Sequence, residues 1–484
     1  MARVLPFIAF LLLVLMAGIR AEGVEVPGVL SAESRQCADC HRSTSVNIYQ
    51  QWGGSAHFRA NVGCFECHGA KETDADALKH YGRHISVIVS PLDCSRCHEK
   101  EVAEFNGSLH SKAGRIMGSL DNTLAEVVEG NLGFKTEGFP EGISSAAVSG
   151  CWQCHGSVVK VNRDGRLDPA TWPNTGMGRV NPDGSEGSCS ACHQRHGFSP
   201  GQARQPENCG KCHMGPDHPH IEIYRESKHG INYYANKDSM NLDSAKWVVG
   251  EDYFDAPTCA TCHMSATKDL PVTHNVGLRL KWNNRPVFVK EAQETDEKWG
   301  HASAAVTGEQ RRENMTKVCA SCHGKNFVDA FYTQYEAQLE LYNEKWARPG
   351  LKLYDKASEV LKAVKGSEYA KFAQKIDYTW FELWHHEGRR VRHAAAMQAP
   401  DYVQWHGNYD LARNFYAHYV PELREVIEMG KTSTPEAKKL AEELEDMLAG
   451  VLNGPDHNWS IGKEDPETKK ERERRREEFM ERYK

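Results

Sequence analysis

Sixteen cysteines occur in this chain of 484 residues, and all of them form Cys-x-x-Cys pairs that are followed at once by a histidine. The pairs, numbered here as motifs 1 to 8, are Cys37/Cys40, Cys64/Cys67, Cys94/Cys97, Cys151/Cys154, Cys189/Cys192, Cys209/Cys212, Cys259/Cys262 and Cys319/Cys322. Their histidines are His41, His68, His98, His155, His193, His213, His263 and His323. Two thiols at this spacing can add to the vinyl groups of one porphyrin, and the adjacent imidazole can bind its iron. Zinc sites or disulfides would leave the histidines unexplained, so the pattern predicts eight covalently attached c-type haems.

Second axial ligands must come from the remaining sixteen histidines. Three of these follow a repeated aromatic-x-x-Ser-x-His pattern, twelve to sixteen residues after a motif histidine; they are His57, His110 and His229. We expect these three as distal ligands, and we add His196, His274, His301 and His406 as further candidates. An electron-transfer haem needs two strong ligands, whereas a catalytic haem needs one open face. Because histidines outnumber the sites, counting alone leaves open whether one iron is accessible to a substrate.

The beginning of the chain is typical of an exported protein. Met-Ala-Arg is followed by a short apolar stretch and a small residue near Ala21, which predicts a signal peptide over residues 1–22. The apolar stretch is short for a membrane span, so we expect no transmembrane span in the mature chain. Export agrees with the cysteines, since bacteria attach c-type haem outside the cytoplasm. The net charge of −7 gives no indication of nucleic-acid binding.

The composition changes once along the chain. Residues 23–326 carry every motif between Gly-, Pro- and Ser-rich stretches, and form the predicted octahaem-binding region. Residues 327–455 show helical spacing of apolar residues over 327–346, 351–365, 367–396, 409–428 and 435–449, which predicts a long-helix bundle. Residues 456–484 form a charged tail, expected as a solvated helix or a disordered segment. The predicted fold is mainly α with little β structure, a multihaem cytochrome c core in which haems replace side chains as core material. The chain without haem is therefore not expected to fold.

Several segments resemble the octahaem hydroxylamine oxidoreductase family, which includes hydrazine dehydrogenases of anammox bacteria. The resembling segments lie at residues 151–156, 167–176, 189–196, 209–218 and 384–390. The resemblance implies a mostly helical fold, homotrimers or higher assemblies of related chains, and a small nitrogen substrate oxidised at the fourth haem in chain order. That haem is the one on motif 4, with His155 as proximal ligand and an open distal face. The other seven haems would have two histidine ligands and pass electrons to a cytochrome c-type acceptor.

The resemblance also implies catalytic residues. The pair above the open haem matches Asp217-His218, and a base is chemically reasonable there because oxidising hydroxylamine or hydrazine removes protons. From spacing alone the same pair could be a loop after Pro216, with His218 or His220 as an iron ligand. A tyrosine of the neighbouring subunit is cross-linked to the catalytic porphyrin in the oxidising members; Tyr416 is the first candidate, followed by Tyr409 and Tyr419.

Two other functions remain open at this point. The same open haem could reduce nitrite or hydroxylamine, as implied for family members without the tyrosine cross-link. A chain with a histidine on both sides of all eight irons would instead be an electron-transfer subunit. In each case we expect an exported protein, located in the periplasm or in the lumen of the anammoxosome.

Overall fold

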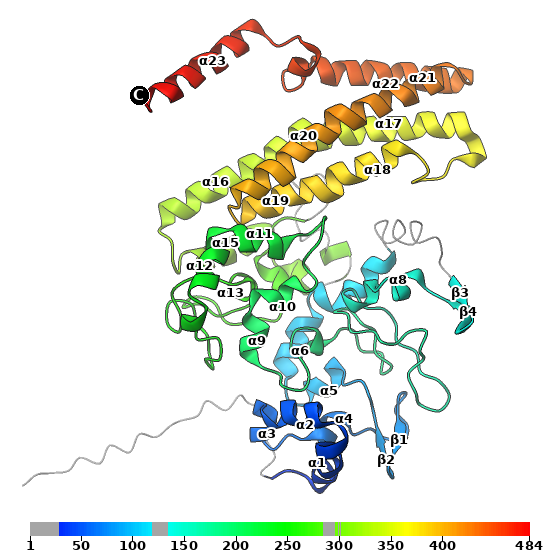
Figure 1. The fold of residues 1–484 in the computed structure, drawn as a ribbon, viewed down its shortest axis with the longest axis vertical. Helices are drawn as coiled ribbons and strands as arrows, with labels where there is room; N and C mark the ends of the chain where they lie inside the picture. Colours follow the sequence, from blue (N-terminus) through cyan, green and yellow to red (C-terminus); the bar gives the residue numbers. More distant parts are fainter. Residues whose placement is uncertain (1–28, 119–133, 284–295, 299, 301) are drawn as a thin grey trace, which may run out of the picture.

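The computed structural model describes residues 29–118, 134–283, 296–298, 300 and 302–484. The predicted signal peptide and His301 lie outside these residues. The described chain confirms the mainly α fold: a part with short helices and long loops carries the cysteines, and long helices stack at one end of it (Figure 1). The described strands form only two antiparallel hairpins. No helix of the described residues has the length and hydropathy of a membrane span.

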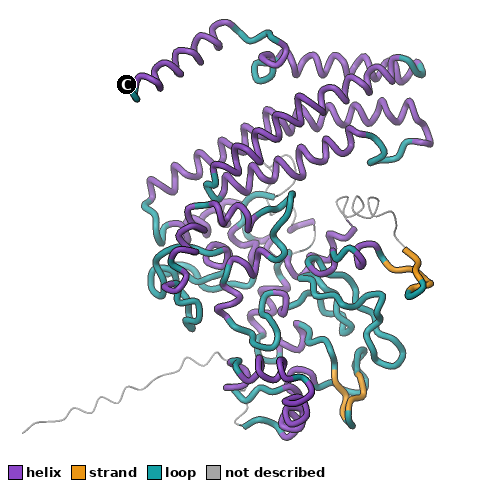
Figure 2. The backbone as a smooth tube through the Cα atoms, viewed as in Figure 1, coloured by secondary structure: helices purple, strands orange, loops and turns teal. Residues whose placement is uncertain are grey.

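The part that carries the cysteines consists of short elements joined by loops (Figure 2). Its α-helices are α1 (Ala32–Thr44), α2 (Val46–Gly53), α3 (Ala56–Arg59), α4 (Cys64–His68), α5 (Pro91–Ser95), α6 (Glu99–Asn106), α8 (Ser145–Val148), α9 (Pro200–Arg204), α10 (Pro206–Gly210), α11 (His220–Glu226), α12 (Lys228–Ala235), α13 (Cys259–His263) and α15 (Gly308–Cys319). The hairpins pair β1 (Leu78–His80) with β2 (Arg83–Ile85), and β3 (Phe134–Thr136) with β4 (Phe139–Ile143). Short 3₁₀ helices include η1 (His110–Gly118), η2 (Cys151–Gln153), η3 (Cys189–Ala191) and η5 (Val276–Arg279).

Hydroxyl side chains cap the N-termini of several helices that carry motif cysteines. Ser31 before α1, Thr258 before α13 and Thr307 before α15 each accept a hydrogen bond from a backbone N–H of the first helical turn. Such caps satisfy N–H groups that have no partner inside the helix. The caps therefore fix where each short helix begins, and with it the position of the cysteines.

The long-helix part has its own apolar core. One continuous helix comprises α16 (Lys325–Tyr342), the π-helical η7 (Asn343–Ala347) and α17 (Arg348–Lys365); the next comprises α18 (Lys375–Phe381), η9 (Glu382–Glu387) and α19 (Gly388–Ala396). The remaining helices are η10 (Tyr402–Tyr409), α20 (Asp410–Asn414), η11 (Phe415–Tyr419), α21 (Val420–Lys431) and α22 (Pro435–Asn453). Buried side chains from Tyr335 to Leu452 pack between them as one cluster. The expected helical segments are thus present, but the third begins at Lys375 instead of residue 367, since Gly366 ends α17 with a positive φ of 54°.

The charged tail is helical. Helix α23 (Pro466–Glu481) contains no buried residue, and it extends away from the long helices in Figure 1. Ion pairs within the tail, such as Arg474 with Glu471, accompany this helix. Of the two expectations for this segment, the solvated helix is the one observed.

Candidate haem and active site

One large cavity runs through the part of the chain that carries the cysteines. Its volume is about 3280 Å³, and it is lined by all eight motif histidines and by every cysteine except Cys322. Ordinary small-molecule pockets measure about 300–1,000 Å³, so the cavity is sized for far more than one small ligand. None of the sixteen cysteines forms a disulfide. The cavity therefore brings the eight motifs together around a common interior.

Six motif histidines face a second histidine across this cavity. The distances between ring centres are 6.2 Å for His41–His80, 6.2 Å for His57–His98, 6.3 Å for His68–His196, 6.0 Å for His110–His213, 6.3 Å for His193–His274 and 6.1 Å for His229–His323. Two imidazoles on opposite sides of one metal ion, with metal–nitrogen bonds of about 2 Å, place their ring centres about 6 Å apart. The six pairs therefore have the spacing that a bis-histidine haem needs.

Burial keeps imidazoles on the cavity wall in the neutral form that binds metal. It lowers the pKa of His110, His193 and His263 to about 4. An imidazole must be neutral to bind iron, so a depressed pKa favours ligation at neutral pH. Cysteine pairs that form no disulfide, neutral buried imidazoles and the size of the cavity together fit covalently bound c-type haem.

The repeated aromatic-x-x-Ser-x-His pattern has a structural cause. The aromatic residues Trp52, Phe105 and Tyr224 are buried, and the backbone N–H of the serine donates to the carbonyl of the aromatic residue. The serine is buried as well, and in two copies, Ser55 and Ser227, its hydroxyl caps the next helix. Each histidine then lies in the first turn of that next element, on the cavity wall. The pattern is a tight turn between two helical elements that places an imidazole opposite the histidine of another motif.

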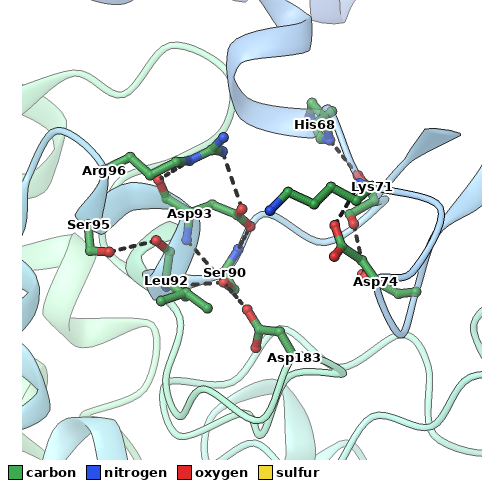
Figure 3. A network of polar contacts seen from close by, with 11 residues as sticks. His68, Lys71, Asp74, Ser90, Leu92, Asp93, Ser95, Arg96 and Asp183 are labelled. Atoms are coloured by element: carbon green, nitrogen blue, oxygen red, sulfur yellow. Dashed lines mark hydrogen bonds and ion pairs between the residues drawn. The ribbon is translucent and has the colours of Figure 1, made fainter. Parts of the chain in front are cut away.

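Polar contacts orient the motifs themselves. The Nδ1 of His68 lies 2.8 Å from the Ser86 carbonyl oxygen, so the ring donates from Nδ1 and keeps Nε2 for the metal. At motif 3, Ser90 caps α5, its backbone N–H donates to Asp93, and its hydroxyl donates to Asp183 at 2.5 Å (Figure 3). This network fixes the helix that carries Cys94 against a loop more than ninety residues away in the chain.

The order of the motifs in space differs from their order in the sequence. Cysteine side chains are close neighbours between motifs 3 and 5, 4 and 6, and 6 and 7; the pairs are Cys94 with Cys189, Cys154 with Cys212, and Cys209 with Cys259. Cysteines of motifs 1 and 2, 2 and 3, 5 and 6, and 7 and 8 also lie near one another. The motifs thus form one row in the order 1-2-3-5-6-7-8, with motif 4 beside motif 6.

A carboxylate and a histidine lie on the cavity wall beside motif 6, where the ring centre of His218 is 6.1 Å from that of His213. The loop after motif 6 carries Asp217 and His218, with His218 Nε2 3.6 Å from Asp217 Oδ1. Two residues of the long-helix part reach the other carboxylate oxygen: Arg389 Nη1 lies 3.3 Å and His385 Nε2 3.8 Å from Asp217 Oδ2. Arg390 Nε also donates to the Pro216 carbonyl at 2.8 Å. The start of α19 therefore holds this loop in place.

The candidate tyrosines lie in the long-helix part, in different environments. Tyr416 is partly buried among Trp346, Phe415 and Trp459, and its hydroxyl lies 2.8 Å from Nδ1 of His457. The buried Tyr419 donates to the Gly350 carbonyl. Tyr409 is half exposed on η10. Of the three, Tyr409 is the one that a neighbouring molecule could reach without rearrangement.

The structure separates the predicted distal ligands into two groups. His57, His110, His196, His229 and His274 each face a motif histidine across the cavity, whereas His406 is exposed on η10 and does not line it. Sequence reasoning missed His80, which faces His41 from the β1–β2 hairpin, and gave no role to His385 or Arg389 beside Asp217. The Trp384–Arg390 segment was the available signal for the last two.

Comparisons with known proteins agree with this site. Residues 178–366 match the family described as seven times multi-haem cytochrome CxxCH, and residues 138–214 match cytochrome c7 and related cytochromes c. A probable nitrite reductase-hydroxylamine oxidoreductase fusion protein of Kuenenia stuttgartiensis is 27% identical over 353 residues, which cover 65% of this chain and 36% of that protein. The match thus spans about a third of the length of that relative.

Two solved structures share the fold. A hypothetical multiheme protein is 25% identical with a TM-score of 0.67, covering 82% of this chain and 96% of its own. A chain of the reducing HAO-like protein complex of Kuenenia stuttgartiensis is 19% identical with a TM-score of 0.51, covering 87% of each chain. At 19% identity, the similarity to the second structure supports a shared fold and nothing more.

Proposed function

We propose that this chain is a multihaem cytochrome c of the hydroxylamine-oxidoreductase-like kind, and that it oxidises hydroxylamine or a related small nitrogen compound such as hydrazine. The reaction is assigned to the haem of motif 4, with His155 as its proximal ligand. The proposal includes eight haems, seven of them bis-histidine, which pass electrons to a cytochrome c-type partner.

One observation carries the assignment of motif 4. Its second cysteine, Cys154, contacts Cys212 and lies 3.9 Å from the Lys211 carbonyl oxygen. The Asp217-His218 loop begins only a few residues later, on the same cavity wall. A porphyrin attached at Cys154 would therefore extend beside a carboxylate–histidine pair, which is the arrangement that proton-coupled oxidation requires.

The protein residues handle the protons of this reaction. The haem, when bound, takes up electrons from the substrate; Asp217 and His218 are placed to accept the protons that leave with them. Arg389 and His385 contact Oδ2 of the Asp217 carboxylate, and the other oxygen, Oδ1, faces His218. An orienting contact of this kind supports catalysis because small displacements of a reacting group are costly.

The spacing of the histidine pairs supports the assignment of distal ligands. We assign His57, His110, His196, His229 and His274 to the irons of motifs 3, 6, 2, 8 and 5, and His80 to motif 1. His301 stays a candidate from the sequence. We assign His406 to none of the irons of its own chain, since it does not line the cavity. The row of motifs then provides a path for electrons from motif 4 through motif 6 toward either end.

A reductive function is the second candidate, and the environment of Tyr416 favours it. This hydroxyl is already bonded to His457, and burial raises the pKa of Tyr416 to about 12. A cross-link through Tyr416 would require the contact with His457 to be lost, so we name Tyr409 as the first candidate for a link to a neighbouring subunit's haem. Without any cross-link, the same haem and the same acid–base pair would serve reduction of nitrite or hydroxylamine.

Location and assembly complete the proposal. The signal peptide over residues 1–22 would direct the chain to the periplasm or, in an anammox bacterium, to the anammoxosome lumen. Residues 23–326 would form the octahaem region, residues 327–455 would provide the contacts of a homotrimer, and residues 456–484 the charged tail. An electron-accepting cytochrome would dock on the assembled protein.

Steady-state assays in both directions test this function. Purified holoprotein is supplied with hydroxylamine or hydrazine and oxidised cytochrome c, and in parallel with nitrite or hydroxylamine and a reduced dye. We expect faster turnover with the first set. Faster nitrite or hydroxylamine reduction would support the second candidate, and an absence of turnover in both directions would contradict an enzymatic role.

A further inference from the structure

Two arginines inside the haem cavity are buried without a carboxylate partner. Arg179 is 1% exposed and Arg279 is 4% exposed, and both line the cavity. Within the described part of the chain, neither guanidinium forms an ion pair. A guanidinium stays protonated in proteins, and a buried charge without a counter-charge costs several kcal/mol.

The hydrogen bonds of these arginines go to neutral groups. Arg279 donates to the carbonyls of Thr261 and Cys262 within motif 7, and also to those of Ser265 and Pro271. Arg179 donates to the Asn174 carbonyl and the Asn181 side-chain oxygen. These contacts orient both guanidinium groups, that of Arg279 beside motif 7, but they supply no negative charge.

A third buried arginine, in contrast, has a carboxylate partner within the protein. Arg311 is fully buried, and its guanidinium is paired with the buried carboxylate of Asp296. By contrast, burial lowers the pKa of Arg179 to about 10 and also lowers the pKa of Arg279. Arg179 and Arg279 thus lack the carboxylate partner that Arg311 has, and both line the cavity.

We propose that Arg179 and Arg279 bind the propionate carboxylates of the attached haems, with Arg279 serving the haem of motif 7. A porphyrin of this class carries two propionates, and guanidinium–carboxylate pairing is the strongest charge-assisted hydrogen bonding available to a protein. The inference depends on haem attachment and not on the direction or substrate of the proposed reaction.

The position of Arg279 has a consequence for electron flow. Arg279 lies on η5 and donates to motif 7; motif 7 is next to motif 6, and motif 6 is next to motif 4. A cation beside a haem stabilises its reduced, more negative form and so raises its reduction potential. Arg279 would thus make the haem of motif 7 a better acceptor for electrons that arrive from motif 4.

Redox titration of holoprotein variants tests this inference. Arg279→Gln removes the charge, Arg279→Lys keeps it, and Arg35→Gln removes an exposed guanidinium that is outside the cavity and bonded to the Leu30 carbonyl. We expect one eighth of the total haem absorbance to titrate at a lower potential in Arg279→Gln. The Arg279→Lys and Arg35→Gln proteins should titrate like the wild type.

Other results of this titration would overturn the role given to Arg279. Equal shifts in the glutamine and lysine variants would mean that only the carbonyl contacts matter, and would overturn the inference, as would an unchanged titration. A shift that depends on the buffer anion would identify a free anion as the partner instead of a propionate. If intact mass shows that Arg279→Gln has lost haem, the same comparison is made with Arg179→Gln and Arg179→Lys, whose loop lies elsewhere in the fold.

Discussion

Replacing Asp217 with asparagine is expected to lower kcat for hydroxylamine oxidation by about 10²–10⁴-fold, the usual contribution of a positioned general base. Asparagine has nearly the same shape as aspartate, so the neighbouring side chains of His218, His385 and Arg389 keep their places. An amide oxygen cannot take up the proton that leaves with the electrons. Stopped-flow reduction of the haems by hydroxylamine measures this step directly.

The control for this variant is another aspartate far from the cavity. Asp465→Asn weakens only the cap of α23, so its turnover should equal that of the wild type. Both variants should contain the same number of haems by mass spectrometry. If Asp217→Asn retained turnover within a few-fold, another group would have to accept the protons, and the role given to the loop after motif 6 would be wrong.

The chain produced without haem should fail to fold over residues 29–324. In cores of packed proteins, a cavity costs roughly 24 cal/mol per Å³. Even a tenth of that value over about 3280 Å³ amounts to roughly 8 kcal/mol, which is comparable to the whole stability of a typical domain, about 5–15 kcal/mol. The long helices differ, because their buried cluster from Tyr335 to Leu452 consists of side chains alone.

Limited proteolysis of protein expressed without haem-attachment machinery measures this difference. We expect rapid cleavage throughout residues 29–324 and a resistant fragment that begins near Lys325, with the helical circular dichroism of that fragment retained. The holoprotein, treated in the same way, should resist cleavage in both parts. A haem-free chain that melts cooperatively and protects residues 29–324 would contradict the view that haems form the core there.

Local patterns in the sequence were sufficient to predict the motifs and the two-part fold. The cysteine pairs, the composition change near residue 327 and the aromatic-x-x-Ser-x-His repeat all depend on neighbours within a few residues. The repeat correctly marked three histidines that face the cavity, because its serine controls a turn only four residues long. The assignment of these histidines to individual irons stays a prediction.

Contacts between distant segments could not be predicted in this way. His80 reaches His41 from a short hairpin that has no motif. Arg389 meets Asp217 across 172 residues, through the packing of α19 on the loop after motif 6. The row of motifs likewise places motif 5 beside motif 3, an order that depends on tertiary folding and leaves no trace in the spacing of the cysteines.

Counting the spin states of the irons is the most direct test of whether this protein has a reacting haem. Electron paramagnetic resonance and magnetic circular dichroism of the fully oxidised holoprotein distinguish high-spin iron with an open face from low-spin iron with two histidines. We expect one high-spin haem among eight, which becomes low-spin when cyanide is added and which is lost in a Cys151→Ala, Cys154→Ala protein. Eight low-spin haems that do not respond to cyanide would contradict a reacting site at motif 4 and identify the chain as an electron-transfer subunit.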